Sequence, residues 1–358
     1  MPGPDLPPPG MQPHGRGQGG TGKPALRLAT YNVEWFDALF DDAGALRVDD
    51  AWSARHEVTR ARQIDALGTV FTALDADAIM VIEAPDTNSR RNTTRALQTF
   101  AHSFDLRTTE VLVGFANNTQ QEIALLYDPA VLRCRHLPGA TEDAPRFDST
   151  FRIDLDIDAT EDKVVFSKPP LEVEAITATG RTLHLIGAHL KSKAPHGAVG
   201  RDQVMRLSIA NRRKQLAQAI WMRRRIEGYL SKGDSLIVMG DMNDGPGLDE
   251  YEHLFGRSSV EILLGEGAGA LFDPHAAQAL LSKLAAQPTS ARFYLAGEHR
   301  YLQALLDYIM ISADLRALGP RWRIWHPFDD LTCWATPELR DALLTASDHF
   351  PVTLDIQL

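Results

Sequence analysis

The sequence predicts an α/β fold in one large domain, on the basis of three observations. Apolar runs of strand length recur along the chain, and some, such as Ala78-Ile-Met-Val-Ile82, contain no polar residue. Segments between these runs carry apolar residues at helical spacing, as Ile64, Leu67 and Phe71 do. The 358 residues are 44% hydrophobic, which is enough to bury a substantial core. The alternation of strands and helices continues without a compositional break, so we expect a single domain over residues 25–358.

The N-terminal half is expected to begin with a tail and then to alternate strands with helices. Residues 1–24 are rich in Pro and Gly and lack the apolar region of a signal peptide, which predicts a disordered tail. β-favouring residues predict a strand over 26–36, and helical spacing predicts a helix over 61–74. The same patterns predict a strand at 78–82, a short helix at 96–100, and strands at 107–113, 122–127 and 151–158.

In the C-terminal half, the turn Thr179-Gly180-Arg181 predicts a hairpin over residues 171–191. An apolar stripe at helical spacing predicts one long helix, or two, over 201–229. Four large apolar residues in succession at 236–239 are typical of a buried strand. We expect mixed helix and loop over 248–300, and closing strands over 305–312 and 350–356.

Charge and cysteine content exclude some classes of protein. The net charge of −10 argues against a passive nucleic-acid or membrane binder, but not against an enzyme that meets phosphates through metal ions. Cys134 and Cys333 lack metal-ligand spacing, and we expect two buried thiols in a reducing compartment. With no signal peptide and no membrane-spanning run, we expect a cytoplasmic protein without stable membrane association. No obligate protein partner is inferred.

Polar residues stand at or near the ends of most predicted strands. In chain order they are Asn32, Glu34, Glu83, His189, Lys191, Lys193, Asp241, Asn243, Asp307, Asp348 and His349. Singly, most have a structural explanation: a turn for Asn32, a solvated strand end for Glu83, or a hydrogen-bonded structural role for His189. Asp307 is different, because a carboxylate inside an apolar strand costs several kcal/mol unless it has a partner.

Together these residue types indicate a particular chemistry. Asp, Glu and Asn oxygens are the hard ligands that Mg²⁺ or Mn²⁺ prefers. A histidine beside an aspartate, as in Asp348-His349, is oriented for proton transfer. Lys191 and Lys193 add positive charge near the same edge. Since no Ser or Cys nucleophile accompanies these groups, they favour metal-assisted attack of water on a phosphate ester.

The ordered motifs TYNVEWFD, IMVIEAPD, IALLYDP, GAHLKSK, VMGDMNDGPG, LLDYIMIS and SDHFPV resemble the endonuclease/exonuclease/phosphatase superfamily, which is deoxyribonuclease I-like. The resemblance runs from about residue 26 to the C-terminus. It is nearest to the bacterial nuclease-like branch. It implies a four-layer α/β sandwich: two mixed β-sheets packed face to face, with helices outside and the active site at one end.

The resemblance also implies roles for individual residues. Asn32, Glu83 and Asp348 match the metal positions, for Mg²⁺ or Mn²⁺. Asp241 and Asn243 match the pair that positions or activates water and contacts the scissile phosphate.

Two histidines complete the implied site. Asp307 matches the carboxylate that orients His349, which acts as a base or stabilises the transition state. His189 matches the second histidine, a general acid or phosphate ligand, and Lys191 and Lys193 are expected at the substrate phosphate.

The implied activity is that of a metal-dependent phosphodiesterase, an endonuclease with DNA or RNA as substrate. Alternatives are a phospholipid or sphingomyelin phosphodiesterase, a small-molecule phosphatase, and a non-catalytic binding module. Residues 201–225 hold eight Arg or Lys against the single Asp202. This stretch is compatible with a rail for the phosphate backbone or with a solvated helix face.

Overall fold

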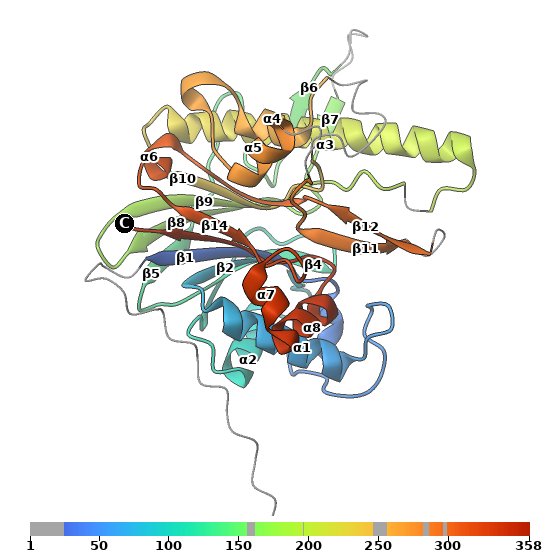
Figure 1. The fold of residues 1–358 in the computed structure, drawn as a ribbon. Coiled ribbons are helices and arrows are strands. Elements are labelled where there is room, and N and C mark those ends of the chain that lie inside the picture. The colour runs from blue at the N-terminus through green and yellow to red at the C-terminus, as the bar shows by residue number, and fades with distance from the viewer. Residues whose placement is uncertain (1–24, 156–161, 196, 246–255, 282–285, 296–298) are drawn as a thin grey trace, which may run out of the picture.

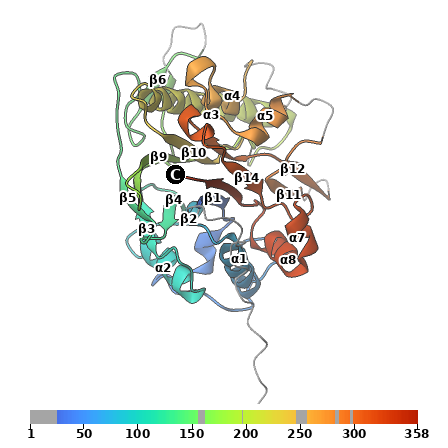
Figure 2. The ribbon, with the colours of Figure 1, turned by 60° about the vertical axis from the view of Figure 1, so that its left-hand side comes forward.

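The structure of the protein, a computed structural model, describes residues 25–155, 162–195, 197–245, 256–281, 286–295 and 299–358. Its centre is two mixed sheets packed face to face, with a layer of helices outside each, so the predicted four-layer sandwich is confirmed (Figures 1 and 2). The tail predicted over 1–24 lies outside the described residues.

The first sheet contains both ends of the described chain. Its strands lie in the order β14 (Arg321–Ile324), β15 (Val352–Ile356), β1 (Leu26–Asn32), β2 (Ala78–Pro85), β4 (Gln121–Tyr127) and β3 (Glu110–Val113). β1 and β2 are parallel, and the other pairs are antiparallel. Four helices cover its outer face: α1 (Arg60–Leu74), α2 (Thr93–Ser103), α7 (Leu331–Ala335) and α8 (Pro337–Ala346) (Figure 1).

The second sheet has the order β13 (Asp307–Ile311), β10 (Leu236–Asp241), β9 (Thr182–His189), β8 (Leu171–Thr177) and β5 (Leu132–His136). Only β9 and β10 are parallel in it. On its outer face lie α3 (Arg201–Leu230), α4 (Ser259–Leu264), α5 (Pro274–Leu281) and α6 (Ala313–Arg316) (Figure 1). Smaller elements are the 3₁₀ turns η1 (Phe36–Leu39) and η3 (Gly267–Gly269) and the pairs β6 (Phe151–Ile153) with β7 (Asp162–Val164) and β11 (Ala291–Leu295) with β12 (Arg300–Ala304).

The central strands are mostly apolar because both of their faces are buried. In β10, Ile237 and Met239 face the other sheet, whereas Leu236 and Val238 face the helices. The two sheets approach closely at Gly187, where an added Cβ would overlap the side chain of Met80. This close packing brings the strand ends of the two sheets together.

Most predicted elements are confirmed, including the 171–191 hairpin, and residues 201–230 form one helix. Some boundaries differ. The first strand ends at Asn32, because the chain turns into η1, and β6 ends at Ile153, with residues 156–158 outside the described part. The expectation of helix and loop alone over 248–300 is wrong, because β11 and the start of β12 fall there. Cys333 is buried as expected, Cys134 is half-buried, and both are free.

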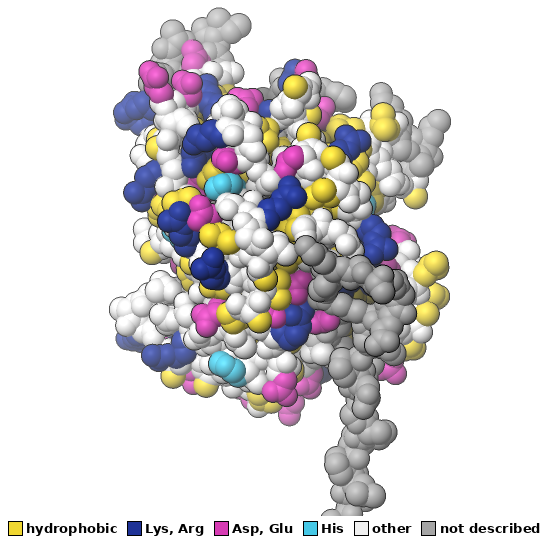
Figure 3. All heavy atoms as spheres, turned by 90° about the vertical axis from the view of Figure 1, so that its left-hand side faces the viewer, with side chains coloured by type: hydrophobic (Ala, Val, Ile, Leu, Met, Phe, Trp, Pro, Cys, Tyr) yellow, Lys and Arg dark blue, Asp and Glu magenta, His cyan; other side chains and the backbone are white. Residues whose placement is uncertain are grey.

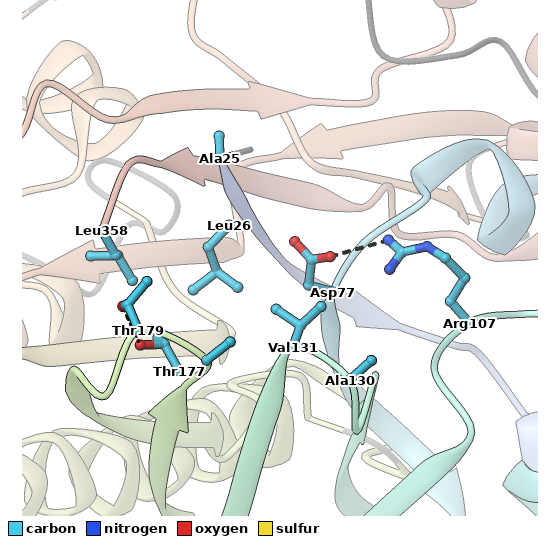
Figure 4. A pocket seen from close by; sticks show the side chains of 10 residues that line it. Ala25, Leu26, Asp77, Arg107, Ala130, Val131, Thr177, Thr179 and Leu358 are labelled. Carbon is cyan, nitrogen blue, oxygen red and sulfur yellow. Dashed lines mark hydrogen bonds and ion pairs between the residues drawn. The ribbon is translucent and has the colours of Figure 1, made fainter. Parts of the chain in front are cut away.

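A pocket of about 490 Å³ lies at the end of the sandwich where β1 begins (Figure 4). Its polar groups are already paired: Arg107 donates to Asp77 at 3.1 Å, and Thr177 and Thr179 share a hydrogen bond of 2.9 Å. Acidic and basic side chains are interspersed over this end of the molecule (Figure 3). None of the predicted site residues lines this pocket.

Among the described residues, no helix is both long enough and apolar enough to cross a bilayer.

Candidate active site

The predicted site residues meet at the opposite end of the sandwich, where β1, β9 and β10 finish and β11 and β12 project (right in Figure 1). Strand register explains why. His189, Asp241 and Asp307 stand side by side on β9, β10 and β13, since His189 and Asp307 are both register partners of Asp241. In the other sheet Asn32 pairs with Ile82, which places Glu83 beside it.

Trp35, Glu83 and Asn243, each at or beside a predicted site residue, have left-handed backbone conformations, with φ of 56°, 61° and 48°. Glu83 occupies a bulge, because the β2–β4 register shifts between Ile82 and Ala84. Such a conformation costs about 1–2 kcal/mol for most residues and less for Asn. Strain of this kind concentrates at functional sites, where the surrounding fold enforces a side-chain direction.

Asp241 joins the two sheets. Its Oδ2 accepts hydrogen bonds from Asn32 Nδ2 at 3.0 Å and Asn243 Nδ2 at 3.1 Å, and its Oδ1 accepts from the backbone N–H of Asn243 at 2.7 Å. Burial, helped by the nearby Asp307 and Glu83, raises the pKa of Asp241 to about 7 against the opposing effect of His349. A positively charged neighbour would stabilise the ionised form of this buried carboxylate.

His349 and Asp307 form a buried pair. His349 Nδ1 lies 2.8 Å from Asp307 Oδ2, which also accepts from the Ser290 hydroxyl at 2.7 Å. The Ser290 oxygen in turn accepts the backbone N–H groups of Leu306 and Asp307. Burial lowers the pKa of His349, but Asp307, Asp241 and Asp348 outweigh it, so this pKa lies well above its usual value. Ser290 was not predicted, and its sequence surroundings carry no signal for this role.

His189 faces different partners. Its Nδ1 lies 3.1 Å from Lys168 Nζ, and its Nε2 lies 3.6 Å from Asp241 Oδ2 and 3.9 Å from Glu83 Oε1. Burial, with the positive charge of Lys168, lowers the pKa of His189 well below its usual value. Gln121 donates to Glu83 Oε2 and accepts from Lys168. Lys168 and Gln121 are functional candidates that the sequence patterns did not identify.

The two predicted phosphate lysines have separate surroundings. Lys193 Nζ donates to the buried Asp244 at 2.5 Å, and Arg212 lies 3.5 Å from the same carboxylate oxygen. Lys191 is partly buried, and its pKa is lowered by burial and by Lys214. A role for either lysine at the substrate phosphate stays a prediction.

The basic stretch 201–225 is partly structural. Arg225 pairs with the buried Glu172, Arg223 bonds backbone carbonyls and Glu227, and Arg212 lies against Asp244. These three arginines are buried or nearly so and hold α3 in place, so for them neither a phosphate rail nor a solvated helix face applies.

The remaining acidic groups lie around this centre. Asp348 is partly exposed, with its Oδ1 4.0 Å from His349 Nε2. Glu34 contacts Arg55, and burial together with Asp348 raises the pKa of Glu34 to about 7.

These residues fit a divalent cation. The Oδ1 atoms of Asn32 and Asp307 are buried and accept no hydrogen bond from any described residue. Ligand atoms of Asp241, Asp307 and His349 lie within 4.8 Å of one another. Oxygen donors predominate, as Mg²⁺ and Mn²⁺ prefer. Of the predicted ligands, Asn32 donates to Asp241 and Asp348 lies 4.0 Å from His349, whereas Glu83 lies 3.9 Å from His189.

Comparisons with known proteins concern the family and the fold of the chain. A profile of the Endonuclease/Exonuclease/phosphatase family matches residues 29–349. Among solved structures, TDP2 from C. elegans aligns at 12% identity over 93% of this chain and 75% of that chain, with a TM-score of 0.50. An endonuclease/exonuclease/phosphatase from Bacteroides vulgatus aligns at 13% identity over 94% and 100%, with a TM-score of 0.46. The human Nocturnin catalytic domain with bound sulfate anion aligns at 15% identity over 93% and 94%, with a TM-score of 0.44.

Among curated proteins, no sequence matches the chain significantly. At 12% identity the likeness to TDP2 concerns the fold alone. The family profile covers most of the chain. The chain therefore belongs to the endonuclease/exonuclease/phosphatase family, whose members are hydrolases that act on phosphoester bonds.

Proposed function

We propose that the protein is a divalent-metal-dependent nuclease that hydrolyses phosphodiester bonds of DNA or RNA, acting as an endonuclease. The observation that carries this proposal is the buried His349–Asp307 pair, which joins the two sheets and lies beside Asp241, with His349 Nε2 3.9 Å from Asp241 Oδ2. In this arrangement a proton acceptor, a carboxylate and oxygen ligands for a cation border one space.

Each residue has a role in the proposed reaction. His349 Nε2 and Asp241 Oδ2 are 3.9 Å apart, too far for a direct hydrogen bond but suited to hold the attacking water between them. Asp307 keeps a proton on His349 Nδ1, so that Nε2 is the atom that takes the proton of this water. A bound Mg²⁺ or Mn²⁺ would supply charge stabilisation at the phosphate, with Asn32, Glu83 and Asp348 as its ligands. Neutralisation of the nearby carboxylates would also lower the raised pKa of His349 towards that of an effective base.

A surface of aromatic and arginine side chains beside the site supports a nucleic acid as substrate. The guanidinium of Arg292 lies 3.3 Å from the ring centre of Tyr301, and the Tyr294 and Tyr301 rings are 5.2 Å apart. Arg292 donates its backbone N–H to Asp348 O at 2.7 Å, so this surface is attached to the catalytic segment. Aromatic rings with arginine are the usual means of stacking unpaired bases beside a phosphate backbone.

Exposed apolar side chains nearby favour a second candidate, a phospholipid or sphingomyelin phosphodiesterase. Leu331 is 84% exposed and Trp334 is 52% exposed, both on α7. Aromatic and aliphatic groups of this kind also serve at membrane interfaces.

The test is cleavage of supercoiled plasmid, linear duplex, single-stranded oligonucleotide and sphingomyelin liposomes, each with Mg²⁺, Mn²⁺ or EDTA. His349→Ala is the site variant, and His102→Ala, an exposed histidine at the end of α2, is its control. We expect metal-dependent nicking of plasmid that His349→Ala loses and His102→Ala keeps. Hydrolysis of liposomes without nucleic-acid cleavage would replace the nuclease with the lipid enzyme.

A further inference from the structure

The side chain of Gln121 has only one orientation that its neighbours allow. It lies between Lys168 Nζ and Glu83 Oε2. An ammonium group can only donate and an ionised carboxylate can only accept. The Gln121 carbonyl oxygen therefore faces Lys168, and its amide nitrogen donates to Glu83. The three side chains form a chain of hydrogen bonds that ends on a predicted metal ligand.

Lys168 also determines which nitrogen of His189 carries a proton. Lys168 Nζ has no lone pair to offer when charged, so His189 Nδ1, 3.1 Å away, must be the acceptor. The ring proton then sits on Nε2. Carboxylate oxygens of Asp241 and Glu83 lie 3.6 and 3.9 Å from Nε2, on the side of the ring where a proton on Nε2 would point. These contacts agree with this tautomer.

The position of Lys168 makes this arrangement stable. It lies in Ser167-Lys168-Pro169-Pro170, a bend that leads into β8, and the two prolines restrict the backbone freedom of this segment. Gln121 is the first residue of β4 and pairs with Pro85 two residues beyond Glu83. One partner thus comes from each sheet, and the hydrogen bonds span the junction between them.

We propose that Lys168 and Gln121 are positioning residues that hold the Glu83 carboxylate for the cation and fix His189 as an Nε2–H donor to a phosphate oxygen. This inference rests on the proposed phosphodiesterase function for its consequence, but not for its geometry. It assigns His189 the role of phosphate ligand. A histidine that acts as a general acid must carry protons on both ring nitrogens, and a proton on Nδ1 would break the bond to Lys168.

The first test is ¹⁵N NMR of the ring nitrogens in histidine-labelled protein at pH 7.5, with His189→Gln used to assign the signals among the 12 histidines. We expect His189 to carry its proton on Nε2 alone. A proton on Nδ1 would overturn the proposal, whatever substrate the enzyme prefers.

The second test compares Lys168→Met with Lys163→Met, an exposed lysine on β7 that serves as the control. Binding of Mn²⁺ is measured by calorimetry without substrate, and hydrolysis is measured with bis(p-nitrophenyl) phosphate. We expect Lys168→Met to weaken Mn²⁺ binding by about 10- to 100-fold, as loss of an outer-shell partner does. We also expect it to lower kcat more than it raises KM, and to change the tautomer signal of His189. Lys163→Met should match the wild type in all three.

The two measurements separate this inference from the proposed function. If no substrate is hydrolysed by any variant, the nuclease proposal fails, while the tautomer and the Mn²⁺ affinity still decide the positioning role. Unchanged Mn²⁺ affinity together with an unchanged His189 signal in Lys168→Met would overturn it.

Discussion

Replacement of Asp307 by asparagine tests the proposed base directly. Asp307 Oδ2 accepts two hydrogen bonds, from the Ser290 hydroxyl and from His349 Nδ1. Ser290 already accepts two backbone N–H groups, so its own proton must point at residue 307. The new amide therefore keeps both bonds only with its carbonyl oxygen at the Oδ2 position. Its nitrogen then occupies the buried Oδ1 position, which has no partner among the described residues.

The expected losses of stability and rate in Asp307→Asn follow from the hydrogen bonds that the variant keeps. An unpaired buried amide costs about 1–3 kcal/mol of stability. The hydrogen bond to His349 remains but the negative charge does not, so we expect the rate to fall by about 10²-fold, the lower end for general-base catalysis. That factor corresponds to about 2.7 kcal/mol of activation free energy. Because Asp307 helps to raise the pKa of His349, the pKa of His349 should be lower in Asp307→Asn than in the wild type.

The assay is the pH dependence of kcat/KM from pH 5 to 9 with saturating Mn²⁺ and bis(p-nitrophenyl) phosphate. A base is inactive when protonated, so the acidic limb of the profile should move to lower pH in Asp307→Asn. The exposed Asp50→Asn is the control and should leave the limb unmoved. A limb that stays in place, or moves to higher pH, would refute His349 as the base that titrates.

Three further predictions concern packing, pH and metal. Gly187→Ala should destabilise the protein by about 1–3 kcal/mol in urea unfolding, because its Cβ meets Met80, and by much less in a Met80→Ala background; equal costs in both backgrounds would contradict this. Burial lowers the pKa of His275 to about 4, so the unfolded chain binds its proton first as pH falls. Relative to His275→Asn, the wild type should lose about 3 kcal/mol of unfolding free energy between pH 7 and pH 4, and a pH-independent difference would count against it. Mg²⁺ at 100 times its Kd should add about 2.7 kcal/mol to the stability of EDTA-treated wild type in thermal unfolding, but not of Glu83→Gln; an equal gain in both would exclude Glu83 as a ligand.

The parts of the fold that could be predicted are those whose signal lies within one segment. β2 and β10 are buried on both faces and each contains an uninterrupted apolar run, 78–82 and 236–239, so their pattern does not depend on the rest of the molecule. β11 is mostly half-buried and β12 is mostly exposed, so neither strand carries the continuous buried apolar run of a central strand. α8 was overlooked although Pro337 stands at its first turn, a recognisable helix start.

The site divides in the same way. Asp241 and His349 adjoin apolar strands, and polar groups in that position are visible in the sequence. Lys168 and Ser290 acquire their roles only through packing. Lys168 lies in the segment before β8 and contacts His189, and Ser290 lies just before β11 and contacts Asp307. No residue near either of them in the sequence indicates its partner.

The pairing of β15 with β1 governs when during synthesis the site can form. Ser347 donates to the carbonyl of Asn32 across 315 residues of sequence, and its oxygen accepts the N–H groups of Glu34 and His349. A ribosome must therefore release nearly the whole described chain before the cation ligands and the base can meet. A nascent chain that stalls before residue 347 lacks both this connection and His349, so a partial product of translation cannot assemble the proposed base.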